Sequence, residues 1–250
     1  MISSKDNPKL KLAQQLLRYK KKRNDLQRFV CDSKEACGHI LRYYPQSIDY
    51  VLVEEKAASF LQGYKALDSE KVLMLQAGLL SQVSDLKQSF GLMLVCHMPK
   101  QSLTDTTFAM ALMDINNPSN LGAIIRSCYA FDCKRLYLIG HCCDVYHPES
   151  VRASAGHLFD CDFMSLPVSE LPSLFKQFNA LTLKADAPQA ISQYSFDQPT
   201  VFVMGSEQGF PDNPHLNAIP SLSIPMVAGC DSLNVGVAAS IALYARYSRS

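Results

Sequence analysis

The chain has 250 residues, of which 48% are hydrophobic and 19% are charged. These proportions exclude a disordered chain, a collagen and a charged filament. No apolar run approaches the ~18 residues that a membrane-spanning helix needs, and the N-terminus lacks the apolar region of a signal peptide. We therefore expect a soluble protein of the cytoplasm.

Charge is unevenly distributed along the chain. The net charge is +1, but residues 1–30 hold nine basic and two acidic residues, and the rest holds 15 basic and 21 acidic ones. The densest basic run is Lys20, Lys21, Lys22 and Arg23. This asymmetry predicts a polyanionic partner, and the alternative is a solvated helix end.

The first segment is predicted to be a helix. Asp6 or Asn7 can cap it and Pro8 suits its first position. An apolar stripe at helical spacing follows, made of Leu10, Ala13, Leu16 and Leu17. We expect the basic run at the C-terminal end of this helix, where the helix dipole favours cations.

Two α/β units are predicted after this helix. In the first, strands are expected at 28–31, 48–53, 71–75 and 92–97, with helices near 34–42, 56–65 and 77–88. A polar linker follows at 99–105. In the second, strands are expected at 108–113, 135–139, 162–165, 180–184, 201–204 and 221–224, with helices near 120–131, 149–156, 168–178 and 233–248. This alternation predicts a mostly parallel sheet with helices on both faces.

Several common sites are absent from the sequence. The eleven glycines never form G-x-G, which excludes the dinucleotide fingerprint and the Gly-rich phosphate loop. The nine cysteines include no C-x-x-C pair. This favours reduced core thiols, and we expect no metal.

Polar clusters follow three predicted strands of the second unit, at 114–126, 205–212 and 225–234. Ligands of parallel sheets bind at the carboxyl ends of strands. In the first cluster Ser119 or Asn120 can cap the next helix. Arg126 lies about two turns further along, roughly on the same side as Asn120. A surface arginine or a structural ion pair is the alternative for Arg126.

The second and third clusters carry further polar groups. Ser206 and Glu207 follow an apolar strand and a glycine, where a ligand can approach closely; the alternative is a solvated strand exit. Asp231, Ser232 and Asn234 crowd one helix start, although one N-cap needs only one of them. That helix is apolar on more than one face, so its own sheet and a second subunit are expected to cover it.

At these clusters the sequence resembles the SpoU (TrmH) family of RNA ribose 2′-O-methyltransferases, in the SPOUT superfamily. The motif N-x-G-x-x-x-R is present as Asn120, Gly122 and Arg126. The G-S-E motif begins at Gly205, and I-P-M followed by S-L-N-V begins at Ile224 and Ser232. H-P-E-S-V-R-A-S-A-G at 147–156 is similar to the family's connecting segment. Residues 106–250 carry the resemblance.

The resemblance implies an α/β-knot fold, in which a mostly parallel sheet with helices on both faces carries a deep C-terminal trefoil knot. It implies a methyltransferase domain at 106–250, preceded by a small α/β substrate-binding domain at 1–98 and the linker 99–105. It also implies S-adenosylmethionine as cofactor, and a homodimer through the knot domain whose site takes residues from both subunits.

Residue roles are carried over by motif. Cofactor contacts are expected from Met204, Gly205, Ile224, Ser232 and Leu233. The catalytic and substrate end is expected to comprise Asn120, Arg126, Glu207, Ser232 and Asn234. RNA contacts are expected from Lys20, Lys21, Lys22, Arg23 and Arg152.

Two positions depart from the family pattern. Family members often have G-S-E-G-x-G, but here Gln208, Gly209 and Phe210 follow Glu207, so the loop is one residue shorter. Cys31-Asp32-Ser33 stands where a glutamate–glycine pair is expected in the first unit. The first departure bears on the geometry of the loop after Glu207, and the second on the way the first unit holds RNA.

The expected reaction is in-line attack of a ribose 2′-hydroxyl on the methyl group of the sulfonium. Arg126 would stabilise the charge that develops on the hydroxyl, because a guanidinium group stays protonated and offers no free general base. Ribosomal RNA is the favoured substrate and transfer RNA the alternative. Two other hypotheses stay open: an RNA-binding or ribosome-assembly protein without activity, and a methyltransferase that acts on a base nitrogen.

Overall fold

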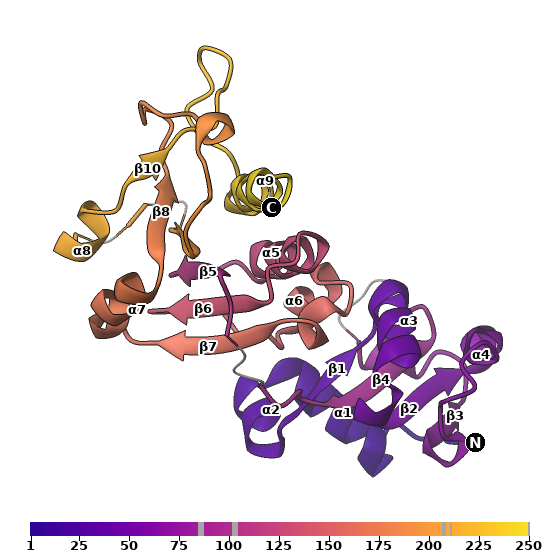
Figure 1. The fold of residues 1–250 in the computed structure, drawn as a ribbon. Helices are drawn as coiled ribbons and strands as arrows, with labels where there is room; N and C mark the ends of the chain where they lie inside the picture. The colour runs from indigo at the N-terminus through magenta and orange to yellow at the C-terminus, as the bar shows by residue number, and fades with distance from the viewer. Residues whose placement is uncertain (85–87, 102–104, 207–208, 211, 250) are drawn as a thin grey trace. The chain divides into compact units, whose positions relative to one another are not determined.

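The computed structural model describes residues 1–84, 88–101, 105–206, 209–210 and 212–249. The chain forms two compact units (Figure 1), residues 1–100 with 144–159 and residues 101–143 with 160–250. The boundary at residue 100 lies in the predicted linker 99–105, part of which is outside the described residues. The predicted continuous domain 106–250 differs from this division, because residues 144–159 belong to the first unit. Within the described ranges, no helix has the length and apolarity that crossing a bilayer requires.

The first unit is built on a four-stranded sheet in the order β1-β4-β2-β3. Strand β4 is antiparallel to β1 and to β2, and β2 is parallel to β3. The strands are β1 (Arg28–Cys31), β2 (Ile48–Glu54), β3 (Val72–Leu75) and β4 (Leu92–His97). The helices are α1 (Pro8–Arg18), α2 (Lys20–Leu26), α3 (Lys34–Tyr43), α4 (Glu55–Leu61) and α6 (Pro148–Ala153). Short 3-10 turns lie at Pro45–Ser47, Ser69–Lys71, Leu80–Gln82 and His157–Phe159.

The predicted first helix is two helices. Asn7 caps α1 by accepting a hydrogen bond from the backbone N–H of Lys9, and the apolar stripe of α1 is buried in the core of the unit. Tyr19 is extended and separates α1 from α2. The basic run therefore begins α2 instead of ending α1, so the expected dipole stabilisation of these cations is wrong.

Arg23 explains why the chain breaks there. Its guanidinium Nη1 donates to the carbonyls of Leu16 and Leu17 at 2.7 and 3.2 Å. These carbonyls lie in the last turn of α1, where helical partners are missing. The side chain of Arg23 thus satisfies the C-terminal end of α1.

The predicted helix at 77–88 is also wrong in its described part. Only the 3-10 turn Leu80–Gln82 is helical there, and residues 85–87 lie outside the description. Gly78 adopts a left-handed conformation with φ of 84°, which an α-helix does not allow. The carboxylate of Glu54 then accepts a hydrogen bond from the backbone N–H of Leu80 and fixes the turn.

Residues 144–159 are bound to the first unit by buried polar and aromatic contacts. Asp144 accepts hydrogen bonds from Arg23, and Arg152 forms an ion pair with Asp32 at 3.1 Å. Phe29 of β1 contacts the ring of Tyr146, with centroids 5.1 Å apart. A segment that follows β6 in the sequence therefore completes the core of the N-terminal unit.

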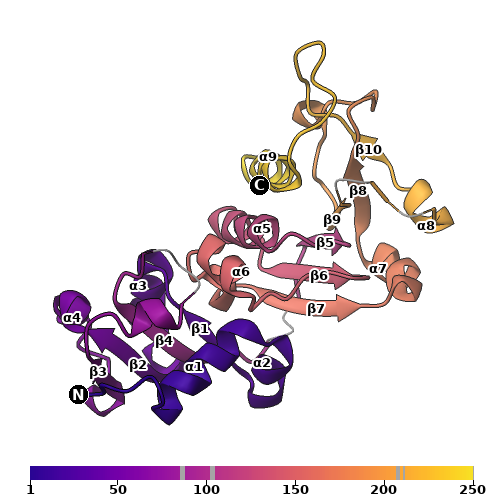
Figure 2. The same cartoon turned by 180° about the vertical axis from the view of Figure 1, so that it is seen from behind.

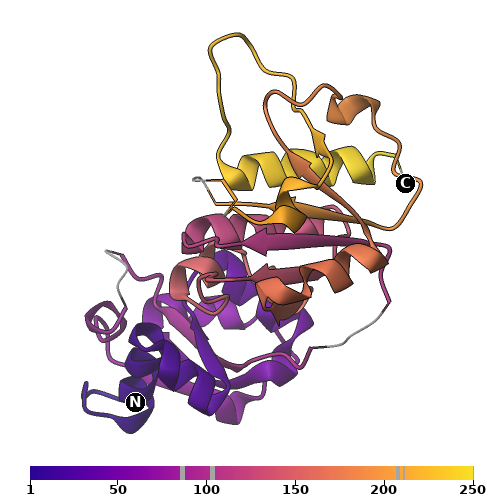
Figure 3. The same cartoon turned by 90° about the vertical axis from the view of Figure 1, so that its left-hand side faces the viewer.

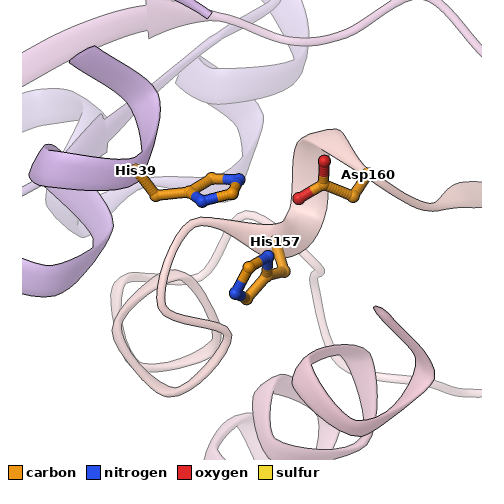
Figure 4. Close-up of side chains that lie close together, drawn as sticks. All are labelled: His39, His157 and Asp160. Carbon is orange, nitrogen blue, oxygen red and sulfur yellow. The ribbon is translucent and has the colours of Figure 1, made fainter. Parts of the chain in front are cut away.

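Two histidines are in contact where residues 144–159 pack against α3. The rings of His39 on α3 and His157 lie edge to face, with centroids 4.3 Å apart (Figure 4). Gly156 precedes His157 with φ of 91°, and a Cβ there would lie 3.0 Å from the carbonyl oxygen of Ala36. Only glycine lets this turn approach α3 so closely. Asp160, the third residue labelled in Figure 4, belongs to the second unit.

The second unit contains a six-stranded sheet in the order β10-β8-β9-β5-β6-β7, and every neighbouring pair is parallel. The strands are β5 (Phe108–Met113), β6 (Arg135–Ile139), β7 (Asp162–Leu166), β8 (Asn179–Leu183), β9 (Thr200–Met204) and β10 (Ser221–Leu222). The helices are α5 (Pro118–Ala130), α7 (Leu171–Gln177), α8 (Pro214–Asn217) and α9 (Val235–Tyr247). The predicted mostly parallel sheet is confirmed.

Helices cover both faces of this sheet. Ala109, Ala111 and Met113 of β5 pack in one core with α7 and α8. Successive strand residues point to opposite faces, so Phe108 belongs to the other face, where it contacts Arg246 of α9. Helix α5 lies beside α9 (Figure 2), and the hydroxyls of Ser127 and Ser240 are hydrogen-bonded at 2.8 Å.

Candidate functional site

A pocket of about 570 Å³ lies at the carboxyl ends of β8 and β9, against the start of α9. We call it the strand-end pocket. Its described lining comes from the ends of β8 and β9, the turn after β9, and the loop from β10 to α9. These residues are Thr182–Ala185, Met204–Ser206, Gly209, Phe210, Ile224, Met226, Asp231–Val235 and Ala238. The location is the one where parallel sheets bind ligands, and the volume lies within the ~300–1,000 Å³ of small-molecule sites.

The turn after β9 is built around Gly205. A Cβ at this position would lie 3.0 Å from the ring of Phe210 and 3.1 Å from the carbonyl oxygen of Gly209. Glycine therefore lets the chain double back, and the N–H of Gly209 donates to the carbonyl of Ser206 at 2.9 Å. Glu207, a predicted catalytic residue, lies outside the described residues.

The loop that leads from β10 into α9, drawn in yellow in Figure 3, also lines the pocket. Asn234 caps α9, because its Oδ1 accepts from the backbone N–H of Gly236 at 2.9 Å. Of the three polar residues that crowd this helix start, Asp231 and Ser232 are thus left to face the pocket and solvent.

A side-chain hydrogen bond connects the first and third sequence motifs. The Nδ2 of Asn234 donates to the Oδ1 of Asn120 at 3.1 Å. The predicted cap by Ser119 or Asn120 is wrong: Asn117 caps α5 by accepting from the N–H groups of both residues. Because Asn117 does this, the side chain of Asn120 is available to Asn234.

Arg126 occupies a different part of α5 from Asn120. Six residues separate them, which in an α-helix is about 9 Å along the axis and about 120° around it. The expectation that they lie roughly on the same side is therefore wrong. Arg126 is exposed, does not line the strand-end pocket, and makes no ion pair within the described part of the chain.

The comparison with known families bears on these motifs directly. Residues 107–244, which include all three, match the model of the SpoU rRNA Methylase family. The chain belongs to this family. The predicted family assignment, made from the motifs at Asn120, Gly205 and Ile224, is confirmed.

Relatives within the family and a solved structure resemble this SpoU protein over different lengths. A 23S rRNA (uridine(2479)-2'-O)-methyltransferase from Streptomyces viridochromogenes is 33% identical over 142 residues, covering 51% of this chain and 48% of the relative. This chain therefore spans about half the length of that relative. The 23S rRNA (guanosine(2553)-2'-O)-methyltransferase RlmP from Bacillus subtilis is 27% identical over 177 residues, covering 68% of this chain and 70% of the relative. The crystal structure of an RNA 2'-O ribose methyltransferase superposes with a TM-score of 0.83 at 25% identity, covering 99% of this chain and 98% of that one.

The cofactor residues predicted for this SpoU protein all lie at one place. Met204, Gly205, Ile224, Ser232 and Leu233 line the strand-end pocket. The prediction missed Lys184, which also lines it. The rule that located the other loops would have found it, because Lys184 directly follows β8 at its carboxyl end.

The predicted RNA-binding residues of the SpoU protein divide into two groups. Lys20 and Lys21 are exposed and Lys22 is half-buried. Arg23 is only 2% exposed and is engaged with Asp144, so its prediction as an RNA contact is wrong. Arg152 is committed to Asp32, whose side chain is 4% exposed, and has the same structural role.

Proposed function

We propose that this chain transfers a methyl group from S-adenosylmethionine to a ribose 2′-hydroxyl of ribosomal RNA. The observation that carries the proposal is the hydrogen bond between Asn120 and Asn234 beside the strand-end pocket. It joins the first and third motifs of the SpoU family at the pocket that the second and third motifs line. The names of the Streptomyces and Bacillus relatives, both 23S rRNA 2'-O-methyltransferases, support the same reaction.

The strand-end pocket fits the proposed cofactor. Apolar side chains such as Leu233 and Val235 line it beside polar groups, a combination that suits an adenosyl group. When bound, S-adenosylmethionine supplies an electrophilic methyl on a sulfonium. The turn at Gly205 and the loop before α9 would hold and orient the bound molecule, since both line the pocket.

We propose that the loop from β10 into α9 passes through the chain segment after β9, forming the deep trefoil knot expected of the family. Such threading is rare in proteins, where a connection between two elements almost never passes through a loop. The lining of one pocket by Ser206 and Phe210 on one loop and by Asp231 and Ser232 on the other supports the proposal.

Helices α5 and α9 are proposed to form the interface of a homodimer. They present exposed apolar side chains that monomeric surfaces seldom place together. These are Tyr129 at 46% exposure, Val237 at 49%, Tyr244 at 58% and Tyr247 at 51%. Arg126 is exposed on the same α5, so a dimer through this surface would bring it toward the pocket of the partner subunit.

In that dimer, Arg126 would stabilise the negative charge that grows on the 2′-hydroxyl as it attacks. A guanidinium stays protonated at all physiological pH values, so it acts through charge and hydrogen bonds rather than as a base. Asn120 and Asn234 would fix the loop against α5 and so keep the ribose in line with the methyl. Correct alignment of this kind contributes a large share of the rate in group transfer.

Lys20, Lys21 and Lys22 are proposed to attract the phosphate backbone. Such attraction is independent of sequence and depends on salt. A ribosomal substrate would agree with the expected location of the protein in the cytoplasm.

The test uses the purified full-length chain, an unmodified 23S rRNA transcript and S-adenosylmethionine with a labelled methyl group. We expect labelled 2′-O-methyl nucleosides after nuclease digestion and mass analysis. Loss of one charge-stabilising donor lowers turnover by about 10²–10³, so Arg126→Ala should lose that much while it keeps cofactor affinity. Label on a base nitrogen, or no cofactor binding by the wild type, would contradict the proposal.

A sedimentation measurement tests the dimer in the same preparation. We expect the wild type at twice the chain mass and Val237→Asp at the mass of one chain, because a buried carboxylate is costly. Thr107→Asp, which changes an exposed residue directly before β5, serves as the control. A monomeric wild type would contradict the interface.

A further inference from the structure

Two side chains of opposite charge line the strand-end pocket. Lys184 follows β8, and Asp231 lies in the loop before α9. They are the charged members of its described lining. Both side chains are exposed, and neither makes an ion pair or a hydrogen bond within the described residues.

The two charges come from different segments of the chain, and neither side chain forms an ion pair within the described residues. Both can therefore meet a charged ligand that enters the pocket. Lys184 directly follows β8, and Asp231 lies in the loop that leads into α9. A pocket lined by one cation and one anion is complementary to a ligand that carries both charges.

We propose that Lys184 binds the carboxylate of the methionine tail of S-adenosylmethionine and that Asp231 binds its α-ammonium group. The inference rests on the proposed function, since it assumes that this cofactor occupies the strand-end pocket. The two contacts would orient the aminocarboxyl tail of the bound cofactor within the pocket.

The assignment makes Lys184 and Asp231 positioning residues for the cofactor. S-adenosylhomocysteine, the product, has the same tail, so both contacts persist after methyl transfer. The pair should therefore set the affinity for both molecules equally and should not by itself favour release of the product.

Isothermal titration of the full-length protein with four ligands distinguishes how each charged group of the cofactor contributes to affinity. S-adenosylmethionine has the carboxylate, the ammonium and the sulfonium, and S-adenosylhomocysteine lacks the sulfonium charge. Decarboxylated S-adenosylmethionine lacks only the carboxylate. Methylthioadenosine lacks the whole aminocarboxyl tail.

For Lys184→Met we expect about tenfold weaker binding of S-adenosylmethionine and S-adenosylhomocysteine, the lower end of the range for a hydrogen bond to a charged group. Decarboxylated S-adenosylmethionine and methylthioadenosine should bind as they do to the wild type. Lys184→Arg, which keeps the charge, should recover most of the affinity. Equal loss for all four ligands would overturn the carboxylate assignment.

For Asp231→Asn we expect about tenfold weaker binding of every ligand except methylthioadenosine. If S-adenosylhomocysteine bound Asp231→Asn as tightly as the wild type while S-adenosylmethionine did not, Asp231 would pair with the sulfonium and the ammonium assignment would be wrong.

Matched controls come from exposed residues of the same unit outside the strand-end pocket. Lys176→Met changes a lysine in the last turn of α7, and Asp186→Asn changes an acid two residues after Lys184. Neither should change any of the four affinities, and all variants should melt with the wild type. Normal wild-type binding with unaffected Lys184 and Asp231 variants would refute this inference alone. A wild type that binds none of the ligands would refute the proposed function as well.

Discussion

Replacement of Arg23 by methionine should destabilise the protein strongly, although the residue lies in a basic run that resembles an RNA contact. The Nε and Nη2 atoms of Arg23 lie 2.8 and 2.7 Å from the carboxylate of Asp144. The two side chains are 2% and 9% exposed. Methionine would leave that carboxylate buried without a counter-charge, and the carbonyls of Leu16 and Leu17 without their donor.

The size of the effect follows from this burial. Removing one partner of a buried ion pair costs about 3–5 kcal/mol, against a total stability of about 5–15 kcal/mol for a typical domain. Since 1 kcal/mol shifts the melting temperature of a protein this size by roughly 2–4 °C, Arg23→Met should melt about 6–20 °C below the wild type.

Scanning calorimetry with two further variants makes the test specific. Lys22→Met removes a neighbouring charge that is not fully buried and should leave the melting temperature within about 1 °C, as for most surface changes. The double variant Arg23→Met with Asp144→Leu should recover much of the loss, because an apolar pair can replace a buried ion pair. If Arg23→Met melted with the wild type, the structural role assigned to this ion pair would be refuted.

Three further outcomes are expected. Asn234→Asp keeps the oxygen that caps α9 but loses the N–H group that donates to Asn120. Thermal stability should therefore persist while turnover falls at least tenfold. Equal turnover in a methyl-transfer assay would contradict a role for this bond. Replacing Lys20–Lys22 by alanine should flatten the slope of log affinity for 23S rRNA against log salt by about 2, whereas Lys34→Ala serves as the control, and an unchanged slope would make the run incidental. Iodoacetamide should label Cys230 before Cys142, because Cys230 is exposed while burial raises the pKa of Cys142. S-adenosylhomocysteine should slow the labelling of Cys230, as measured by peptide mass. An unaffected labelling rate would mean that the bound ligand leaves this loop open.

Local sequence patterns predicted most of the secondary structure. The strands Arg28–Cys31, Leu92–His97, Phe108–Met113 and Arg135–Ile139 have the predicted bounds. Each is a short apolar run between polar turns, and such a run is stable as a strand wherever a sheet buries it. The predictions failed where a conformation depended on a distant contact, as at Gly78, where Glu54 fixes the turn.

The candidate site also has a part that the sequence predicted and a part that it did not. The motif residues Gly205, Ile224 and Leu233 lie after strands, and the carboxyl ends of parallel strands share one edge, so their convergence was predictable. Which of several polar residues caps a helix was not. Asn117 and Asn234 perform this role, and their neighbours Asn120 and Asp231 are available for other contacts.

By itself, the sequence determined the family, the order of the strands and helices along the chain, and the loops that carry polar groups. These features depend on residues that are near one another in the sequence. The tertiary structure decided the fate of individual charges. Arg23 and Lys22 are neighbours in one basic run, yet only Arg23 is buried, because Asp144 lies 121 residues further along the chain and pairs with it. The sequence could place Lys184 at a strand end, but only the folding of three loops around one pocket brought it to the same pocket as Asp231. The sequence specifies which residues are charged. The partner of each charged side chain and its exposure to water depend on which distant segments pack against it.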